Sequence, residues 1–223
     1  MSLSVAVIIA ALDEERSIGA AIDSAFAAGT AEVIVSDGGS VDRTVAIARS
    51  RGARLIETEA MRSRQFNRGA EAAESDALIF LHADTTLPAG AAAAVADALQ
   101  RADFGGFRVR FANSAMKLRV AAGMINLRTR LTRCPWGDQA QFIRRTTFLQ
   151  DGGFREIPLM EDYDLALRMK RRGRSIVLPL TVTTSGRRFL EKGVLRTAMI
   201  NWFIIARWRL GADAATLARI YRS

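Results

Sequence analysis

The chain has 223 residues, enough for one domain with a large buried core, and its hydrophobic fraction of 49% excludes wholesale disorder. Its 32 Lys and Arg against 23 Asp and Glu give a formal net charge of +9, which favours anionic partners such as nucleic acid, lipid headgroups or a phosphorylated small molecule. The single cysteine, Cys134, cannot form an internal disulfide, so we expect a reducing, cytoplasmic compartment. No apolar run reaches the roughly 18 residues that span a bilayer, and the first residues lack the basic start of a signal peptide. We therefore expect a protein that is soluble, or peripheral on the inner face of the membrane.

The first half of the chain alternates continuous apolar runs with amphipathic segments. Runs of this kind, separated by helices, are typical of a parallel sheet covered on both faces. Right-handed crossovers then build a doubly wound, mostly parallel α/β sheet. The predicted strands are 3–11, 31–36, 53–58 and 77–81, and the predicted helices are 17–29, 41–52, 62–73 and one that begins near Pro88.

After about residue 100 the alternation loosens. The stretch GGFRVRF (105–111) alternates like an antiparallel or edge strand, EDYDLALRMKRRG (161–173) predicts a helix ending at Gly173, and SIVLPL (175–180) predicts another strand. We expect an α/β domain over residues 1–186 and a basic, amphipathic, helical segment over residues 187–223.

The C-terminal segment carries a stripe of apolar residues among arginines. Two interpretations are open: the stripe packs against its own domain or a second subunit, giving a homodimer, or it lies on anionic lipid as an interfacial helix. Burial is the more common fate of such a stripe. The stripe consists of Val194, Leu195, Met199, Trp202, Phe203 and Ile205.

Acidic residues follow three of the predicted strands. Asp13 and Glu14 follow the first, Asp37 the second, and His82 and Asp84 the fourth. Because the predicted strands are parallel, we expect these loops to converge at one edge of the sheet. Ligands of such sheets bind at this edge, outside the carboxyl ends of the strands. Crowded carboxylates resist ionisation unless a cation offsets them. A divalent metal held by Asp84 and by substrate oxygens would do so, although each loop alone is also ordinary turn chemistry.

The glycines of DGGS (37–40) allow the backbone to approach a ligand closely. The sequence contains neither a GxGxxG pattern nor a GxxxxGK pattern. A conventional dinucleotide dehydrogenase or P-loop enzyme is therefore disfavoured.

Four blocks of the sequence, in this order and spacing, resemble the inverting family 2 glycosyltransferases of the GT-A fold: VAVIIAALDEE, EVIVSDGGSVDRT, ALIFLHADTTLP and MEDYDLALRMKRRG. The resemblance covers about residues 3 to 175. The sequence is most similar to a small bacterial subgroup labelled arsenosugar-biosynthesis glycosyltransferases, through the motifs HAD, DGGS, WGDQAQFIRR and GVLRTAMINWF. The resemblance to family 2 implies a hexosyltransferase that uses Mg²⁺ or Mn²⁺ and moves a sugar, with inversion, from a nucleotide-diphospho-sugar to an acceptor hydroxyl. A UDP-sugar is the favoured donor, and the resemblance names no acceptor.

By position, the resemblance also assigns roles to residues. Asp37 matches the residue that reads the base, Asp84 the ligand of the metal that bridges the diphosphate, and Asp162 the general base. The positions that match nucleotide contacts are Ala11, Asp13, Glu14, Asp37, Gly38, Arg62, His82 and Ala83. The candidate contacts to the acceptor or the diphosphate are Asp138, Gln139, Glu161, Arg187 and Arg188.

The sequence departs from the family pattern at three of these positions. His82 stands for the first aspartate of the metal motif, Asp13 for an asparagine, and Gly38 for the second aspartate of DDGS. The histidine removes one negative charge beside the metal, which allows the alternative of a catalytically silent nucleotide-binding homologue. Purely structural explanations of these residues are also open. Acidic residues such as Asp162 favour a first helical turn, and GDQ (137–139) could be an ordinary turn.

A basic nucleic-acid-binding protein is the alternative from another class. It is prompted by the net charge and by runs such as RMKRRGR (168–174). Aromatic residues make up only 7% of the chain, and no stacking motif for bases is present. We therefore expect no nucleic-acid partner.

Overall fold

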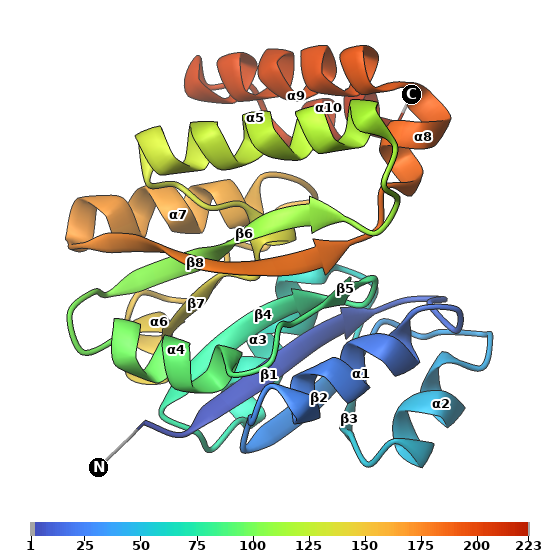
Figure 1. Ribbon diagram of the computed structural model, residues 1–223, viewed down its shortest axis with the longest axis vertical. Coiled ribbons are helices and arrows are strands. Elements are labelled where there is room, and N and C mark those ends of the chain that lie inside the picture. Colours follow the sequence, from blue (N-terminus) through green and yellow to red (C-terminus); the bar gives the residue numbers. More distant parts are fainter. Residues whose placement is uncertain (1–2, 223) are drawn as a thin grey trace.

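The first four strands form a parallel half-sheet, as the sequence predicts. The computed structural model describes residues 3–222, apart from the side chains of Arg188 and Arg222. Its eight strands form one mixed sheet in the order β3-β2-β1-β4-β7-β6-β8-β5 (Figure 1). The pairs β3–β2, β2–β1 and β1–β4 are all parallel. The strands of this half are β1 (Val5–Ala11), β2 (Glu32–Asp37), β3 (Arg54–Glu57) and β4 (Ala77–His82).

Strand β1 is buried on both faces, which explains its unbroken apolar sequence. Val7 and Ile9 point into a cluster with α1, α2 and α4, whereas Ala6 and Ile8 point into a second cluster with α3, α6 and α7. The mostly parallel α/β fold with helices on both faces is therefore confirmed. These helices are α1 (Ile18–Ala27), α2 (Thr44–Ser50), α3 (Arg62–Ala72), α4 (Ala91–Ala98), α6 (Arg145–Gln150) and α7 (Glu161–Arg172).

The second half of the sheet is mixed. It contains β5 (Thr85–Thr86), β6 (Phe104–Phe111), β7 (Phe142–Arg144) and β8 (Ser175–Thr184). The prediction of an antiparallel or edge strand over 105–111 is confirmed in its first alternative, because β6 is antiparallel to β7. It is not an edge strand, since β8 pairs with its other side in parallel. Alternation shows that one face of a strand is less covered, and it does not show whether the strand has one neighbour or two.

Two helices differ from expectation. Helix α4 begins at Ala91 rather than near Pro88, because Gly90 first turns the chain with a φ of 72°. Helix α5 (Met116–Thr132) is absent from the predicted elements, since its apolar residues lie on its exposed side as well as its buried side. A short 3-10 helix, η1 (Gly137–Gln139), follows it.

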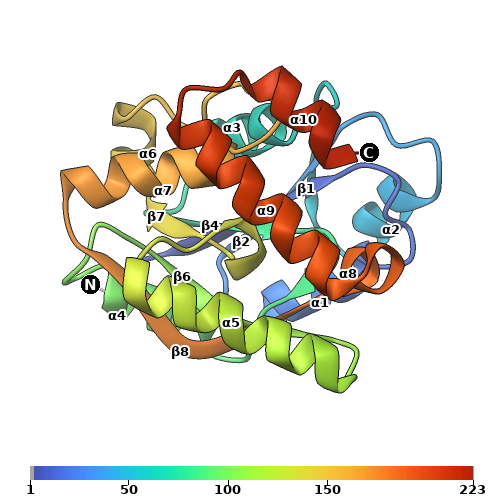
Figure 2. The ribbon, with the colours of Figure 1, turned by 90° about the horizontal axis from the view of Figure 1, so that it is seen from above.

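The C-terminal segment folds as three helices, α8 (Arg187–Lys192), α9 (Val194–Arg209) and α10 (Ala214–Arg222), which lie over one end of the sheet with α5 (Figures 1 and 2). Ile204 and Ile205 of α9 are buried in the second cluster. Most of the apolar stripe does not pack against the domain: the exposed members are Leu195, Met199, Trp202 and Phe203. Within residues 3–222, no helix is long and apolar enough to cross a membrane.

Candidate active site

The carboxyl ends of β2, β1 and β4 lie side by side. Asp37 at the end of β2 is in register with Ala11 of β1, and His82 at the end of β4 is in register with Ala10. The loops that follow these three strands therefore share one edge of the sheet, where open α/β sheets bind ligands. Ala83 is buried directly beyond the end of β4.

Two of the acidic loops are fixed by hydrogen bonds to each other. Asp37 is 2% exposed, and its Oδ2 accepts hydrogen bonds from the amides of Gly39 (2.9 Å) and Ser40 (2.8 Å). The Asp13 amide donates to Ser40 Oγ (2.9 Å), and Asp13 Oδ1 accepts from the Val41 amide (2.9 Å). Asp37 thus organises its own loop, and Ser40 and Val41 of that loop join it to Asp13 in the loop after β1.

A buried glutamine, which belongs to none of the sequence motifs, fastens these strand ends to α3. Gln65 Nε2 donates to the carbonyl oxygens of Ala11 (2.7 Å) and Ser36 (2.9 Å). A Cβ on Gly38 would lie 3.1 Å from the Cα of Ala60 and 3.2 Å from Gln65 Nε2, which explains the glycine in the second position of DGGS. The signal that could have identified Gln65 is a polar residue on the buried face of an amphipathic helix.

Arg187 joins the loop after β1 to the end of β4. The antiparallel pairing of Thr85 with Thr184 brings the end of β8, and so the start of α8, to this edge. One terminal nitrogen of Arg187 lies 3.1 Å from both carboxylate oxygens of Glu14 and 3.7 Å from Oδ2 of Asp84. Burial, and then the nearby Glu14, raise the pKa of Asp84, whereas Arg187 lowers it. The guanidinium is thus the counter-ion of both carboxylates. The side chain of Arg188 lies outside the part of the chain that the structure describes.

The residues at this edge fit a divalent metal only together with a substrate. Within the described residues, no group of three His, Cys, Asp or Glu side chains could hold a metal. Mg²⁺ is commonly bound by one or two carboxylates, with phosphate oxygens and water completing its coordination. Asp84 and Glu14, each 24% exposed in their side chains, can supply such carboxylates.

A cavity of about 270 Å³ lies beside this edge. It is bounded by the end of β4, the first turns of α3 and α7, the end of β8, and helices α8 to α10. Asp37, Asp13 and Gly38 do not line this cavity. The structure therefore separates them from the charged residues that do. Among its lining residues are Arg62, His82, Asp84, Asp138, Glu161 and Asp162.

One wall of the cavity carries an ion pair in which only the carboxylate is buried. Arg62 Nε lies 3.0 Å from Oε1 of Glu161, whose side chain is 3% exposed, whereas that of Arg62 is 41% exposed. Burial raises the pKa of Glu161, and Arg62 opposes that effect. A terminal nitrogen of Arg62 also lies 3.4 Å from Nε2 of His82. Burial and this guanidinium lower the pKa of His82 to about 3, so His82 is neutral at pH 7.

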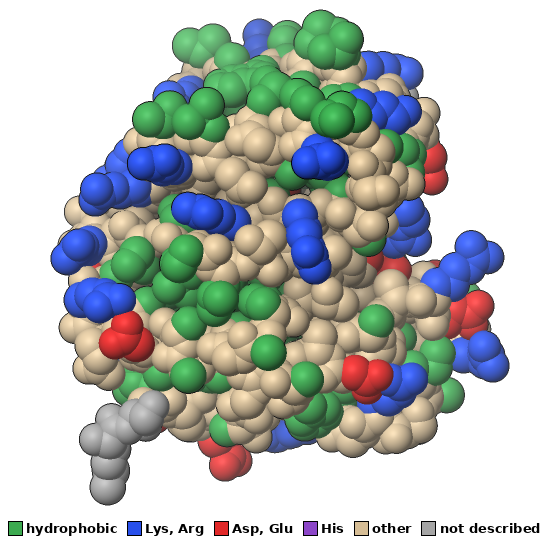
Figure 3. All heavy atoms as spheres, viewed as in Figure 1, with side chains coloured by type: hydrophobic (Ala, Val, Ile, Leu, Met, Phe, Trp, Pro, Cys, Tyr) green, Lys and Arg blue, Asp and Glu red, His purple; other side chains and the backbone are tan. Residues whose placement is uncertain are grey.

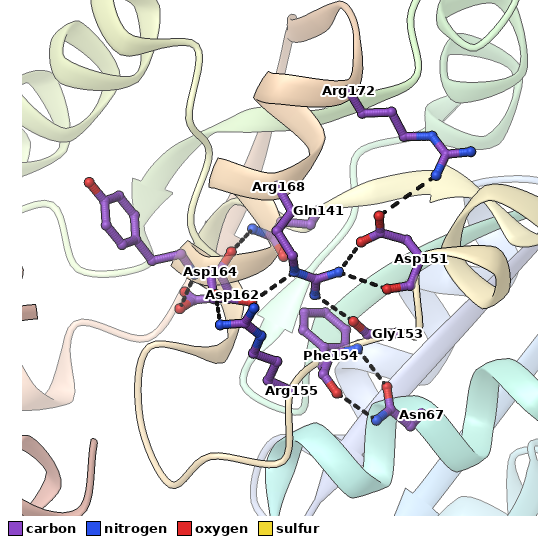
Figure 4. A network of polar contacts seen from close by, with 11 residues as sticks. Asn67, Gln141, Asp151, Gly153, Phe154, Arg155, Asp162, Asp164, Arg168 and Arg172 are labelled. Atoms are coloured by element: carbon purple, nitrogen blue, oxygen red, sulfur yellow. Dashed lines mark hydrogen bonds and ion pairs between the residues drawn. The ribbon is translucent and has the colours of Figure 1, made fainter. Parts of the chain in front are cut away.

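Asp162 is held in a defined orientation. Its Oδ2 accepts a hydrogen bond of 2.6 Å from the Gly137 amide, and its Oδ1 accepts one of 2.7 Å from the Tyr163 amide. Gln141 Nε2 donates to the backbone oxygen of Asp162 (2.9 Å; Figure 4). The carboxylate is therefore fixed within the cavity by η1 and by the start of its own helix.

The rest of α7 is anchored by a polar network around Asp164, two residues after Asp162 (Figure 4). Arg168 Nε donates to Asp164 Oδ2 (2.8 Å), and the same guanidinium pairs with Asp151 and donates to the backbone oxygen of Gly153. Arg155 lies 3.1 Å from the other oxygen of Asp164. Asp164 is thus part of the scaffold, whereas Asp162 faces the cavity.

Asp138 differs from its neighbour Gln139. Asp138 Oδ1 is buried without a hydrogen-bond partner, and burial raises the pKa of Asp138 to about 6, with Arg128 opposing and Asp162 adding to the rise. Gln139 is fully buried: its Oε1 accepts from Thr129 Oγ1 (2.7 Å) and its Nε2 donates to the backbone of Phe107. Of the two candidate acceptor contacts, the geometry leaves Asp138 available to a ligand and commits Gln139 to the fold.

Comparison with known proteins places this chain in a family. Residues 6–155 match the sequence profile of Glycosyl transferase family 2. The chain belongs to this family. No curated protein sequence matches the chain.

Solved structures share the fold of this family 2 glycosyltransferase at low sequence identity. TarS 1–349 of S. aureus is 15% identical, with a TM-score of 0.64 over 98% of this chain and 69% of that one. The same protein in complex with UDP is 16% identical, with a TM-score of 0.61 over 98% of this chain and 70% of that one. A mycobacterial protein is 20% identical, with a TM-score of 0.55 over 82% of this chain and 65% of that one. At these identities the likeness supports the GT-A type of fold.

Several residues of the candidate site carry no signal in the sequence. The Arg128 guanidinium lies 3.3 Å from the centroid of the Trp136 ring, next to Asp138. Asn201 of α9 and Tyr221 of α10 line the cavity. No local pattern marks them, because they reach the site only through the packing of α5, α9 and α10. Met160, directly before the Glu161–Asp162 pair, has a φ of 73°, which is unusual outside glycine and occurs often at functional sites.

Proposed function

We propose that this family 2 glycosyltransferase moves a hexosyl group, with inversion, from a UDP-sugar to an acceptor hydroxyl, and that Asp162 is the general base. The observation that carries the proposal is the placement of the Asp162 carboxylate, fixed by Gly137, in one cavity with Asp84. An inverting transfer needs a base on the acceptor hydroxyl and positive charge on the departing diphosphate, and this cavity offers both.

The cationic residues would act on the donor. Arg187, beside Glu14 and Asp84, and Arg62, beside His82, direct guanidinium groups to the edge where the diphosphate would lie. Such groups stabilise the negative charge that develops on the leaving diphosphate. The loop of Asp37 and Gly38 lies outside this cavity, which suits contact with the base and ribose end of the nucleotide.

The metal of the proposed reaction would be held by Asp84, with Glu14 nearby and substrate oxygens completing the coordination. A bound Mg²⁺ or Mn²⁺ would neutralise charge on the diphosphate. The neutral imidazole of His82 lies where the family motif has a carboxylate, so we expect weaker metal affinity than a site with two aspartates would have. The arsenosugar subgroup and the cytoplasmic location remain predictions.

Calorimetric titration with UDP, with and without Mn²⁺, tests the nucleotide site. We expect binding that strengthens with Mn²⁺, and a variant Asp84→Ala that binds UDP without this metal effect. Asp97→Ala, which removes an exposed carboxylate of α4, is the matched control and should bind as the wild type does. Metal-dependent binding that survives in Asp84→Ala would contradict the metal assignment.

A screen of nucleotide sugars for hydrolysis or transfer tests the activity. We expect turnover of a UDP-sugar by the wild type. Binding of UDP without turnover of any donor would instead support the catalytically silent homologue. That alternative has one specific observation in its favour, the pairing of both Glu14 and Asp84 with Arg187.

A further inference from the structure

Exposed apolar side chains gather on two helices. Within the described residues, eleven large apolar side chains are at least 50% exposed, and all but Val41 lie on α5, on α9 or at the residue after α9. On α5 they recur every three or four residues. On α9 the steps are four, three and one residue, and the last member follows seven residues later, which again keeps them on one side of the helix. We call them the α5–α9 face: Met116, Val120, Met124, Leu127 and Leu131, with Leu195, Met199, Trp202, Phe203 and Leu210.

The two helices form one continuous surface. Helices α5 and α9 contact each other, and Figure 2 shows both in front when the molecule is seen from above. At the top of Figure 3, green side chains gather over these helices with blue side chains beside them. Contiguous apolar patches of this kind mark interaction sites on soluble proteins, whereas single exposed apolar residues need no explanation.

The charge of the α5–α9 face has one sign. The sequences of Met116–Thr132 and Val194–Arg209 contain several Lys and Arg residues and no Asp or Glu. Exposed basic residues therefore flank the apolar stripes, and no acidic residue of either helix offsets them. These basic residues are Lys117, Arg119, Arg130, Arg196, Arg207 and Arg209.

This combination discriminates between two occupants. A second copy docked through the same face would set basic residues against basic residues, with no acidic partner on either helix. An anionic bilayer supplies an apolar interior for the stripes and negative headgroups for the flanking cations. Trp202, which is 58% exposed, suits the boundary between the two. We propose that the α5–α9 face docks on the surface of a bilayer that contains anionic phospholipid.

The docking surface adjoins the candidate active site. A small apolar cavity of about 90 Å³ lies between α5 and α9 and is lined by Met124 and Trp202 of the face. It shares the lining residues Ile125, Trp136, Phe189 and Asn201 with the cavity that contains Asp162. Docking through this face would therefore hold the candidate active site next to the headgroups of the bilayer.

Co-sedimentation of the full chain with vesicles tests the proposal without any nucleotide sugar, so its outcome is independent of the proposed activity. We expect binding to vesicles with about 30% phosphatidylglycerol, no binding to phosphatidylcholine alone, and a loss of binding at about 0.5 M NaCl, where charges are screened. The double variant Leu127→Glu with Met199→Glu should bind about tenfold more weakly or worse. Val41→Glu, at a position 92% exposed and off the face, should bind as the wild type does.

Fluorescence gives a second measurement. Anionic vesicles should shift the tryptophan emission of the wild type to the blue, and Trp202→Phe should lose most of that shift. The proposal is overturned if folded wild type ignores anionic vesicles, or if the double glutamate variant sediments with them as well as the wild type does. It is equally overturned if light scattering shows a dimer that the double variant abolishes while vesicles bind neither protein, because a second copy would then cover the face.

Discussion

The amide of Gly137 donates a hydrogen bond of 2.6 Å to Oδ2 of Asp162, and this bond ties η1 to the first turn of α7. A Cβ on Gly137 would lie 2.9 Å from Nε2 of His82 and 3.1 Å from that same carboxylate oxygen. The glycine is therefore required by the close approach of two candidate site residues. Its backbone also decides where the Asp162 carboxylate points.

We expect Gly137→Ala to displace Asp162 and lower kcat for transfer about tenfold or more, since small misplacements of a catalytic group carry large rate penalties. The affinity for UDP should change little. Gly123→Ala on α5 is the matched control, because a Cβ there meets nothing within 4 Å. Steady-state kinetics with the donor identified by the screen measures both variants, and an unchanged kcat in Gly137→Ala would contradict the positioning role.

Replacing the base itself should have a larger effect. Asp162→Asn keeps the shape of the side chain and removes the proton acceptor, so kcat should fall by a factor of about 10² to 10⁴ while UDP still binds. Asp164→Asn, two residues along the same helix, should instead weaken the network with Arg168 and Arg155 and lower the free energy of unfolding by roughly 3 kcal/mol. The two variants should differ in kind, and wild-type turnover by Asp162→Asn would remove Asp162 from the mechanism.

Asp138 gives a prediction in pH. Its pKa is about 6 in the fold against 3.8 in the reference state, so between these values the folded protein binds more protons than the unfolded chain. Its contribution to stability therefore decreases as pH rises through this window, and the charged form remains destabilising above it. Asp138→Asn removes the buried charge. We expect this variant to be more stable than wild type at about pH 7.5, with the difference shrinking near pH 4.5, in urea unfolding experiments. A difference independent of pH would show that Asp138 is not buried in its charged form.

Arg187 should matter for the donor more than for the fold. Without its guanidinium, Glu14 and Asp84 lose their shared counter-ion, the pKa of Asp84 should rise further, and the edge loses a cation for the diphosphate. We expect Arg187→Ala to weaken UDP binding about tenfold, which is about 1.4 kcal/mol, and Arg187→Lys to restore part of it. Arg101→Ala, which breaks an exposed ion pair with Asp97, is the control. Equal affinity of Arg187→Ala and wild type for UDP would refute a role at the diphosphate.

The sequence anticipated the half of the fold in which each element is specified locally. The apolar run of Val5–Ala11 is long, rich in Val and Ile, and bounded by turn residues, so its strand and its double-sided burial follow from composition alone. The helix over Arg62–Ala72 was also predicted from its local sequence. For Phe104–Phe111 the sequence predicted a strand but left open whether it was antiparallel or at an edge, because its neighbours β7 and β8 come from distant segments. The sequence did not predict the helix Met116–Thr132, whose apolar residues do not all face the core.

The residues alone indicate that acidic loops follow three parallel strands at one edge of the sheet, because side-chain periodicity and turn chemistry act over a few residues. Which of these residues meet depends on the folded structure. It separated Asp37 from the cavity of Asp162 and brought Arg187 to Glu14 across most of the chain's length. It also left the stripes of α5 and α9 facing outward. Contacts between distant segments depend on how whole helices pack on the sheet, and no local pattern encodes that packing.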